Sequence, residues 1–232
     1  MTESRSPQSR PVLFVLTSYG SKGSTGEPTG YYLPEVTHPL AELQEAGIAV
    51  EFASIKGGQP PVDGVDLSDR ITARYWQDEG FRARLENTHR LADVDASRYA
   101  AIFFAGGHGA MWDFPQDAGV LRATRAIHEA GGIVAAVCHG PAALVNVTLS
   151  DGRPLVEGKR IAAFTDSEER AVKLDTVVPF LLASRLVERG ALHQPAADWT
   201  ANVVVDGRLV TGQNPQSASG VGAALRQLLL AA

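Results

Sequence analysis

Apolar residues in this chain fall into short runs separated by segments of mixed polarity. The run at 12–17 is almost wholly apolar, which is typical of a strand buried on both faces of a sheet. The segment 34–47 instead has apolar positions at helical spacing, a proline at its start and a glycine at its end, and it predicts a helix. A second strand is predicted over 48–55. The strands at 12–17 and 48–55, with the helix between them, form a strand–helix–strand unit of the parallel type.

The same alternation continues to the end of the chain. Strands are expected at 99–105, 132–137 and 160–165, a hairpin around an Asp-Gly turn at 203–211, and helices at 117–130, 171–190 and 217–230. The apolar stretch that begins at Gly140 is also predicted to be helical, and Pro179 is expected at a boundary or kink. Strands that alternate with helices predict an α/β domain with a mostly parallel sheet.

The 232 residues suffice for one large α/β domain or two small ones. We predict a single α/β domain over 11–232, with a small insertion at about 56–98 and a disordered tail over 1–10. Within the insertion, 69–91 is charged with sparse apolar positions and is predicted to be helical and partly exposed, either as a surface excursion or as a functional lid. The Gly/Ser-rich loop from 18 to 33 is expected to line the pocket.

Composition narrows the function classes. A net charge of −5, a pI near 5.7 and the absence of any basic run argue against a nucleic-acid surface. The first ten residues lack the apolar core of a signal peptide, and no apolar run approaches the ~20 residues that span a bilayer. A single cysteine excludes an internal disulfide and fits a reducing compartment, so we expect a cytoplasmic protein.

That single cysteine, Cys138, stands where the strand 132–137 ends and a Gly-Pro pair opens the next segment. A polar residue on a sharp strand-to-helix turn is the arrangement of a nucleophile elbow. The N–H groups of the following helix would favour the thiolate, which is the reactive form. A lone cysteine is often a small buried apolar residue, but this context favours a catalytic nucleophile.

Three further residues are candidates for the same site. Glu35 lies in the first turn of a predicted helix. It could be a helix cap or a partner of the helix dipole, or it could be a buried, protonated acid/base beside the sulfur. His139 need not contact the thiol, but its ring could act as a base and its N–H could form half of an oxyanion hole. Gly107 could supply the second N–H, although a glycine pair is also common in a simple tight turn.

A carboxylate in the segment 165–169 could orient the His139 ring, as the acid of a catalytic triad does, but the spacing does not say which one. The remaining histidines lack close metal-ligand spacing and are interpreted as surface or packing residues: His38, His89, His108, His128 and His193. We therefore predict no metal site at these histidines.

The sequence 135–141, Ala-Ala-Val-Cys-His-Gly-Pro, resembles the nucleophile motif of the ThiJ/PfpI superfamily. That superfamily has a flavodoxin-like fold, similar to class I glutamine amidotransferases, and the resemblance extends from about residue 12 to 229. Other segments resemble its larger, glyoxalase III-type branch: 29–39, 54–63, 106–113, 158–166 and 209–219.

By position, the resemblance implies that Cys138 is the nucleophile, Glu35 the acid/base beside it, His139 a second base and Glu169 the triad acid. Glu168 next to it makes that last alignment less secure. The branch converts methylglyoxal and related 2-oxoaldehydes to D-lactate and other 2-hydroxy acids without glutathione. It needs no metal or redox cofactor, and its members are stress-related and often homodimeric.

Alternatives remain. The same residues could serve a holdase chaperone, a cysteine peptidase, or a specialised hydratase-type enzyme acting on another small electrophile. A true amidotransferase is not expected, because it needs a His-x-Glu pair downstream of the cysteine, and His193 is followed by Gln194 and Pro195.

Overall fold

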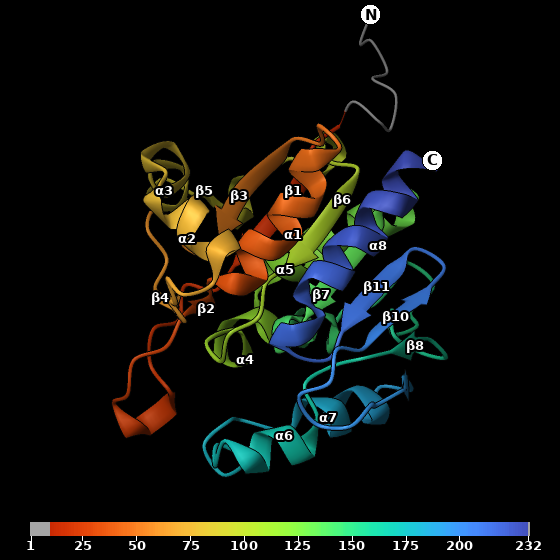
Figure 1. Cartoon of the computed structure of the whole chain (residues 1–232). Coiled ribbons are helices and arrows are strands. Elements are labelled where there is room, and N and C mark those ends of the chain that lie inside the picture. The colour runs from red at the N-terminus through yellow and green to blue at the C-terminus, as the bar shows by residue number, and fades with distance from the viewer. Residues whose placement is uncertain (1–9, 232) are drawn as a thin grey trace, which may run out of the picture.

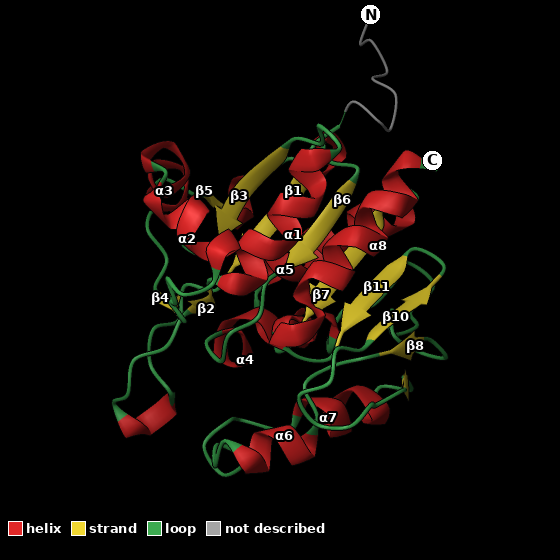
Figure 2. Cartoon of the chain, in the orientation of Figure 1, coloured by secondary structure: helices red, strands yellow, loops and turns green. Residues whose placement is uncertain are grey.

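The computed structural model describes residues 10–231, and its centre is a seven-stranded sheet (Figures 1 and 2). The strand order is β10-β11-β7-β6-β1-β3-β5, and every neighbouring pair is parallel except β10 with β11. The strands are β1 (Val12–Leu16), β3 (Val50–Ser54), β5 (His89–Arg90), β6 (Ala101–Phe104), β7 (Ile133–Val137), β10 (Val203–Asp206) and β11 (Leu209–Gly212). The predicted mostly parallel sheet and the hairpin around Asp206 and Gly207 are confirmed.

The middle of the sheet is buried on both faces, as its apolar runs predict. All residues of β1, β6 and β7 are buried. Phe14 of β1 lies opposite Phe52 and Phe103 on the neighbouring strands, and its ring packs against both. Because β1, β3, β6 and β7 run parallel, their carboxyl ends meet along one edge of the sheet, which is where α/β proteins usually bind ligands.

Helices cover both faces of the sheet. Figure 1 shows α1 (Pro34–Glu45) and α8 (Ala218–Leu230) packed side by side in front of the sheet, with α5 (Ala118–Glu129) behind it. The other helices are α2 (Arg70–Gln77), α3 (Glu79–Glu86), α4 (Ala110–Asp113), α6 (Asp166–Ala171) and α7 (Leu182–Glu188). No helix within the described residues is long and apolar enough to cross a membrane.

The segment 56–98 contains α2, α3 and the edge strand β5, so its helical prediction over 69–91 is confirmed in outline. Asp78 separates the two helices, because it ends α2 and its carboxylate accepts the Phe81 N–H at 2.8 Å to cap α3. Two small parallel pairs, β2 (Tyr31–Tyr32) with β4 (Val62–Asp63) and β8 (Arg160–Ile161) with β9 (Leu192–His193), lie outside the main sheet. The division into one domain plus an insertion stays a prediction, and the predicted tail, Arg10 apart, lies outside the described residues.

Three predicted elements differ from the structure. The strand expected over 160–165 is only β8, because the Phe164 N–H donates to the Cys138 carbonyl at 3.0 Å instead of to a strand. The helix expected over 171–190 is interrupted between α6 and α7, where Lys173 has a φ of 60° and Pro179 cannot continue a helix. The helix expected to begin at Gly140 is a 3₁₀ helix of five residues, Gly140–Leu144.

Candidate active site

Cys138 occupies a strained turn at the carboxyl end of β7. Its φ is 59°, in the left-handed region that side chains other than glycine rarely adopt. The turn is held from both sides, since the Cys138 N–H donates to the Gly212 carbonyl at 2.9 Å and the Cys138 carbonyl accepts from Phe164. A Cβ on Gly140 would lie 2.3 Å from the Phe104 carbonyl oxygen, so only glycine fits two residues later. Such strain is typical of functional positions.

The His139 ring lies between Cys138 and Glu169. Its Nδ1 is 3.4 Å from the Cys138 Sγ, and its Nε2 is 2.8 Å from the Glu169 carboxylate. The ring therefore does contact the thiol, which the sequence left open. Burial and the neighbouring His108 lower the pKa of His139, so the ring is neutral at neutral pH. Glu169 accepts a hydrogen bond from Nε2–H, which leaves Nδ1 as the acceptor that faces the sulfur.

Glu169 is held by two histidines. Burial alone would raise its pKa, but His139 and His108 lower it to about 2, so the group is a carboxylate. His108 Nε2 lies 3.0 Å from Glu169 Oε1, and the His108 ring packs on the His139 ring with centroids 4.1 Å apart. His108 is thus a packing residue, as interpreted, but it also contacts Glu169 and lines the pocket, which was not predicted. The Gly-Gly-His-Gly turn that follows strand β6 was the signal for it.

His108, His139 and Glu169 bring ligand atoms to within 4.8 Å of one another, so this group could hold a metal ion. Two imidazoles and a carboxylate are a common set of zinc or iron ligands. No such spacing is visible in the sequence, because 30 positions separate His139 from Glu169 and 61 separate His108 from Glu169. That the protein works without a metal stays a prediction.

Glu168, the neighbouring carboxylate, has a structural position. It closes a capping box with Thr165 at the start of α6. Its other oxygen accepts hydrogen bonds from the Trp199 N–H and from the side chains of Gln213 and Asn214. Only Glu169 reaches His139, which removes the ambiguity between the two glutamates as far as contact is concerned.

Glu35 is fully buried on the other side of the sulfur, in the first turn of α1. Its Oε2 accepts the Gly106 N–H at 2.8 Å, while Oε1 is buried with no nitrogen or oxygen partner among the described residues. Burial raises the pKa of Glu35 to about 8, against the opposing effects of the Cys138 thiol and the Gly106 N–H. The carboxyl is thus mainly protonated at neutral pH, as the acid/base prediction requires.

The expectation of a low-pKa thiol is wrong for the resting site. Burial raises the pKa of Cys138, and Glu35 raises it further, while the His139 backbone N–H lowers it. Only 4% of the residue is exposed, and the 3₁₀ helix that follows is too short to counter this desolvation. The thiol and Glu35 therefore do not both ionise near neutral pH. His139 Nδ1 lies 3.4 Å from the thiol, and its role as a base stays a prediction.

Gly106 and Gly107 lie between the Glu35–Cys138 pair and the loop at residues 30–32. A Cβ on Gly106 would lie 2.4 Å from Glu35 Oε2 and 2.9 Å from Cys138 Cβ, so a side chain there would push the pair apart. Gly107 has a φ of 98°, and within residues 10–231 its N–H donates to no carbonyl. Gly107 and His139 both line the pocket, and their role as an oxyanion hole stays a prediction.

The pocket above Cys138 has a volume of about 340 Å³. One wall is apolar and aromatic, with Phe164 against the His139 ring at 4.3 Å and Trp199 against Phe164 at 5.8 Å. The loop 18–33 contributes Lys22, Glu27 and Tyr32 to the lining, which confirms the expectation for that loop.

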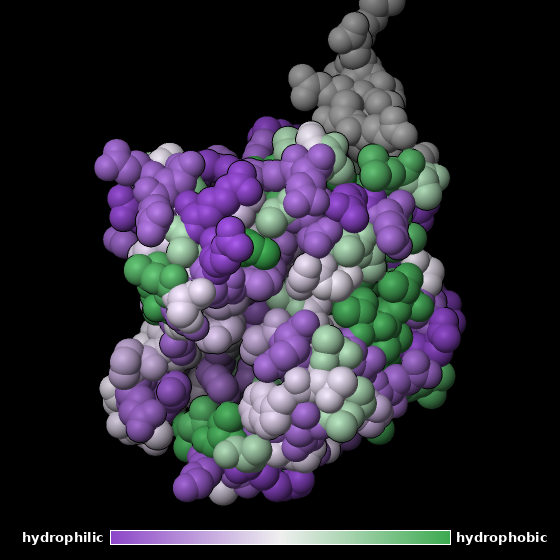
Figure 3. Space-filling model, in the orientation of Figure 1, coloured by the Kyte–Doolittle hydropathy of each residue, from purple (hydrophilic) through white to green (hydrophobic). Residues whose placement is uncertain are grey.

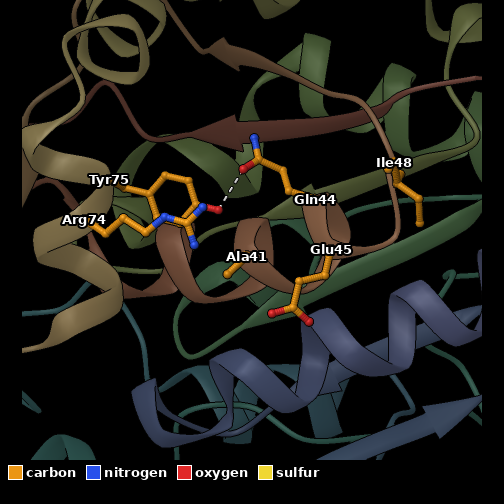
Figure 4. Close-up of a pocket in the computed structure, with 7 residues that line it drawn as sticks. Ala41, Gln44, Glu45, Ile48, Arg74 and Tyr75 are labelled. Atoms are coloured by element: carbon orange, nitrogen blue, oxygen red, sulfur yellow. Dashed lines mark hydrogen bonds between the residues drawn. The ribbon is translucent and has the colours of Figure 1, made fainter.

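A second hollow, of about 500 Å³, lies beside α1 and α2 (Figure 4). Gln44 and Tyr75 join the two helices there through a 2.8 Å hydrogen bond, and Arg74 and Glu45 also line it. Its lining contains none of the predicted catalytic residues, whereas Glu35, Cys138 and His139 all line the pocket above Cys138.

Comparison with known proteins agrees with this fold. Residues 29–226 match the DJ-1/PfpI family. The chain belongs to this family. It is 32% identical to Glyoxalase 3 of Candida albicans over 89% of this chain and 93% of the relative. It is 34% identical to the glutathione-independent glyoxalase HSP31 of Saccharomyces cerevisiae, over 90% of this chain and 93% of the relative.

Solved structures of the DJ-1/PfpI fold superpose closely. The Rapid Encystment Protein 24 kDa of Francisella tularensis matches with a TM-score of 0.92 and 38% identity, over 95% of this chain and 99% of that chain. Glyoxalase III of Candida albicans matches with a TM-score of 0.84 and 31% identity, over 93% of this chain and 95% of that one.

Proposed function

We propose that this DJ-1/PfpI protein is a glutathione-independent glyoxalase. It converts methylglyoxal and related 2-oxoaldehydes to 2-hydroxy acids, D-lactate in the case of methylglyoxal, with Cys138 as the nucleophile. The observation that carries the proposal is the placement of one sulfur between a protonated Glu35 and the His139–Glu169 pair. Near-full-length relatives that are named glutathione-independent glyoxalases support the same reaction.

In the first step the Cys138 sulfur attacks the aldehyde carbon, C1. His139 Nδ1 takes the thiol proton, and Glu169 stabilises the imidazolium that forms. The electrons of the C1–O double bond move onto oxygen, where the N–H groups of Gly107 and His139 hold the developing charge. That oxygen takes a proton from solvent water, which gives a hemithioacetal while His139 keeps the thiol proton.

The next steps move protons only. The C1 proton leaves to a base, its bonding electrons form a C1–C2 double bond, and the C2 carbonyl oxygen takes a proton from Glu35. The resulting enediol is protonated on C2 and loses a hydroxyl proton on C1, which gives a lactoyl thioester. Water then attacks C1 and loses its protons to solvent, and the carbon–sulfur bond breaks. The leaving sulfur takes back the proton held by His139, and lactate is released. Because C2 gains a hydrogen as C1 loses one, the reaction is redox-neutral overall.

Lactate formation from methylglyoxal in buffer free of glutathione and other thiols tests the proposal. We expect robust turnover by the wild type and its loss in both Cys138→Ala and Glu35→Gln. A stereospecific lactate assay then shows whether the product is the D isomer. A wild type that forms no lactate while iodoacetamide still alkylates Cys138 would mean that the site serves another electrophile.

The alternative functions have weaker support. A holdase chaperone needs a gathered apolar surface, but the exposed apolar residues belong to separate elements, and the green groups in Figure 3 are apart on the face shown. For the peptidase and hydratase alternatives we see no specific observation in the pocket. A homodimer in the cytoplasm is part of the proposal, and light scattering of the purified protein and fractionation of cells test those two points.

A further inference from the structure

Glu169 is hydrogen-bonded to two imidazole rings. Its Oε2 meets His139 Nε2 at 2.8 Å, and its Oε1 meets His108 Nε2 at 3.0 Å. An ionised carboxylate can only accept hydrogen bonds, so each ring donates from Nε2. A neutral ring that donates from Nε2 has a lone pair on Nδ1. One buried carboxylate thus fixes both histidines in the same tautomer, with Nδ1 able to accept a proton.

The two rings face different groups. The His139 side chain is 1% exposed, and its Nδ1 faces the Cys138 sulfur. The His108 side chain is 17% exposed and lines the pocket, and among residues 10–231 nothing is hydrogen-bonded to its Nδ1. The free nitrogen of His139 is therefore occupied by the thiol, while that of His108 is available to a molecule bound in the pocket.

The turn that carries His108 holds the ring rigidly. Gly107 has a φ of 98°, and a Cβ on Gly109 would lie 2.4 Å from the Tyr19 carbonyl oxygen, so glycines are required on both sides. The ring also packs on His139 at 4.1 Å and edge-on to Phe164 at 6.1 Å. A preorganised base needs such a fixed ring.

The proposed reaction needs a base that the other groups do not readily provide. After attack by sulfur, His139 carries the thiol proton and Glu35 carries its own, yet a proton must leave C1. We propose that His108 is a further catalytic residue of the glyoxalase reaction, an inference that rests on the function proposed above. Its Nδ1 takes the proton from C1 of the hemithioacetal and returns it to C2 of the enediol.

The step balances without any further reactant. The C1–H bond breaks, its electron pair forms the C1–C2 double bond, and the C2 carbonyl oxygen is protonated by Glu35. When the enediol collapses, the proton on His108 Nδ1 forms the new C2–H bond, and the C1 hydroxyl proton returns to Glu35. Each group ends in its starting state.

The variant His108→Gln separates this role from a purely structural one. The amide it introduces can still donate a hydrogen bond to Glu169 but is no base, so the thiol site should stay intact. We expect iodoacetamide to alkylate Cys138 at the wild-type rate in this variant. We expect kcat for methylglyoxal to fall at least about 100-fold, the usual scale of general base catalysis. With deuterium on the aldehyde carbon, the isotope effect on kcat should rise, because proton removal has become the slow step.

A second variant guards against misfolding. His108→Ala opens space beside the pocket, and added imidazole should restore its turnover in a saturable manner while leaving the wild type unchanged. His89→Gln, on the exposed edge strand β5, is the matched control and should behave as the wild type.

Three results would overturn the inference. His108→Gln could keep wild-type turnover, its alkylation and turnover could fall together, or imidazole could fail to restore His108→Ala. All three leave the wild type active and the proposed function standing. An inactive wild type would instead refute the proposed function, and this inference with it.

Discussion

Replacing Glu35 by glutamine removes one buried ionisable group without removing its shape. The amide can still accept the Gly106 N–H, and its NH₂ group can face the sulfur. Burial raises the pKa of the native carboxyl from 4.5 to about 8. A carboxyl whose pKa is raised on folding contributes most to stability below pH 4.5, and that contribution is lost as the pH rises towards 8.

The magnitude follows from the pKa values. A pKa that differs by one between the folded and the unfolded chain corresponds to about 1.4 kcal/mol of unfolding free energy. Between pH 5 and 7 the unfolded chain releases the Glu35 proton while the folded chain largely keeps it. The unfolding free energy of Glu35→Gln, relative to the wild type, should therefore increase by roughly 2 to 3 kcal/mol over this interval.

Urea denaturation at pH 5, 6 and 7 measures this difference. Glu45→Gln is the matched control, because Glu45 lies on the same helix with 74% of its side chain exposed. Its stability difference from the wild type should change by less than about 0.5 kcal/mol over the same range. A difference between Glu35→Gln and the wild type that is the same at all three pH values would refute the assignment of Glu35 as a protonated, buried carboxyl.

Further predictions concern the groups around this pair. Gly106→Ala inserts a methyl group between Glu35 and Cys138, so we expect loss of most lactate formation and about 1 to 3 kcal/mol of stability, measured by turnover and urea denaturation. Glu169→Gln should lower kcat by about 10²- to 10⁴-fold and slow alkylation of the thiol, because the amide cannot stabilise the imidazolium. An unchanged alkylation rate would argue against the triad. Glu168→Gln should instead lower the unfolding free energy by about 2 to 4 kcal/mol, since one amide cannot accept all the hydrogen bonds of that carboxylate; wild-type stability would contradict its structural role.

The parts of the site that could be predicted are those with local signals. The end of an apolar strand, a cysteine and a Gly-Pro pair predict the turn at Cys138, and a proline followed by a glutamate predicts the helix start that carries Glu35. The parallel sheet then brings these strand ends to one edge. Burial of Glu35, and with it the raised pKa, depends on packing that the sequence pattern does not describe.

The sequence contains a signal that tells which of Glu168 and Glu169 contacts His139. Thr165 and Glu168 have the spacing of a capping box, which assigns Glu168 to the helix start and leaves Glu169 for His139. His108 had a weaker signal, because its contact with Glu169 joins a turn after β6 to the start of α6, 61 residues away. The interrupted helix over 171–190 shows the same limit, since Lys173 adopts a left-handed backbone that its side chain does not favour.

The most direct test of the proposed function is the steady-state rate of lactate formation from methylglyoxal in thiol-free buffer, with wild type beside Cys138→Ala. Cys138 is the only cysteine in the chain, so the comparison removes the only thiol. We expect steady turnover by the wild type and none above background in the variant. Lactate formation at equal rates by both proteins would contradict the role of Cys138 as the nucleophile.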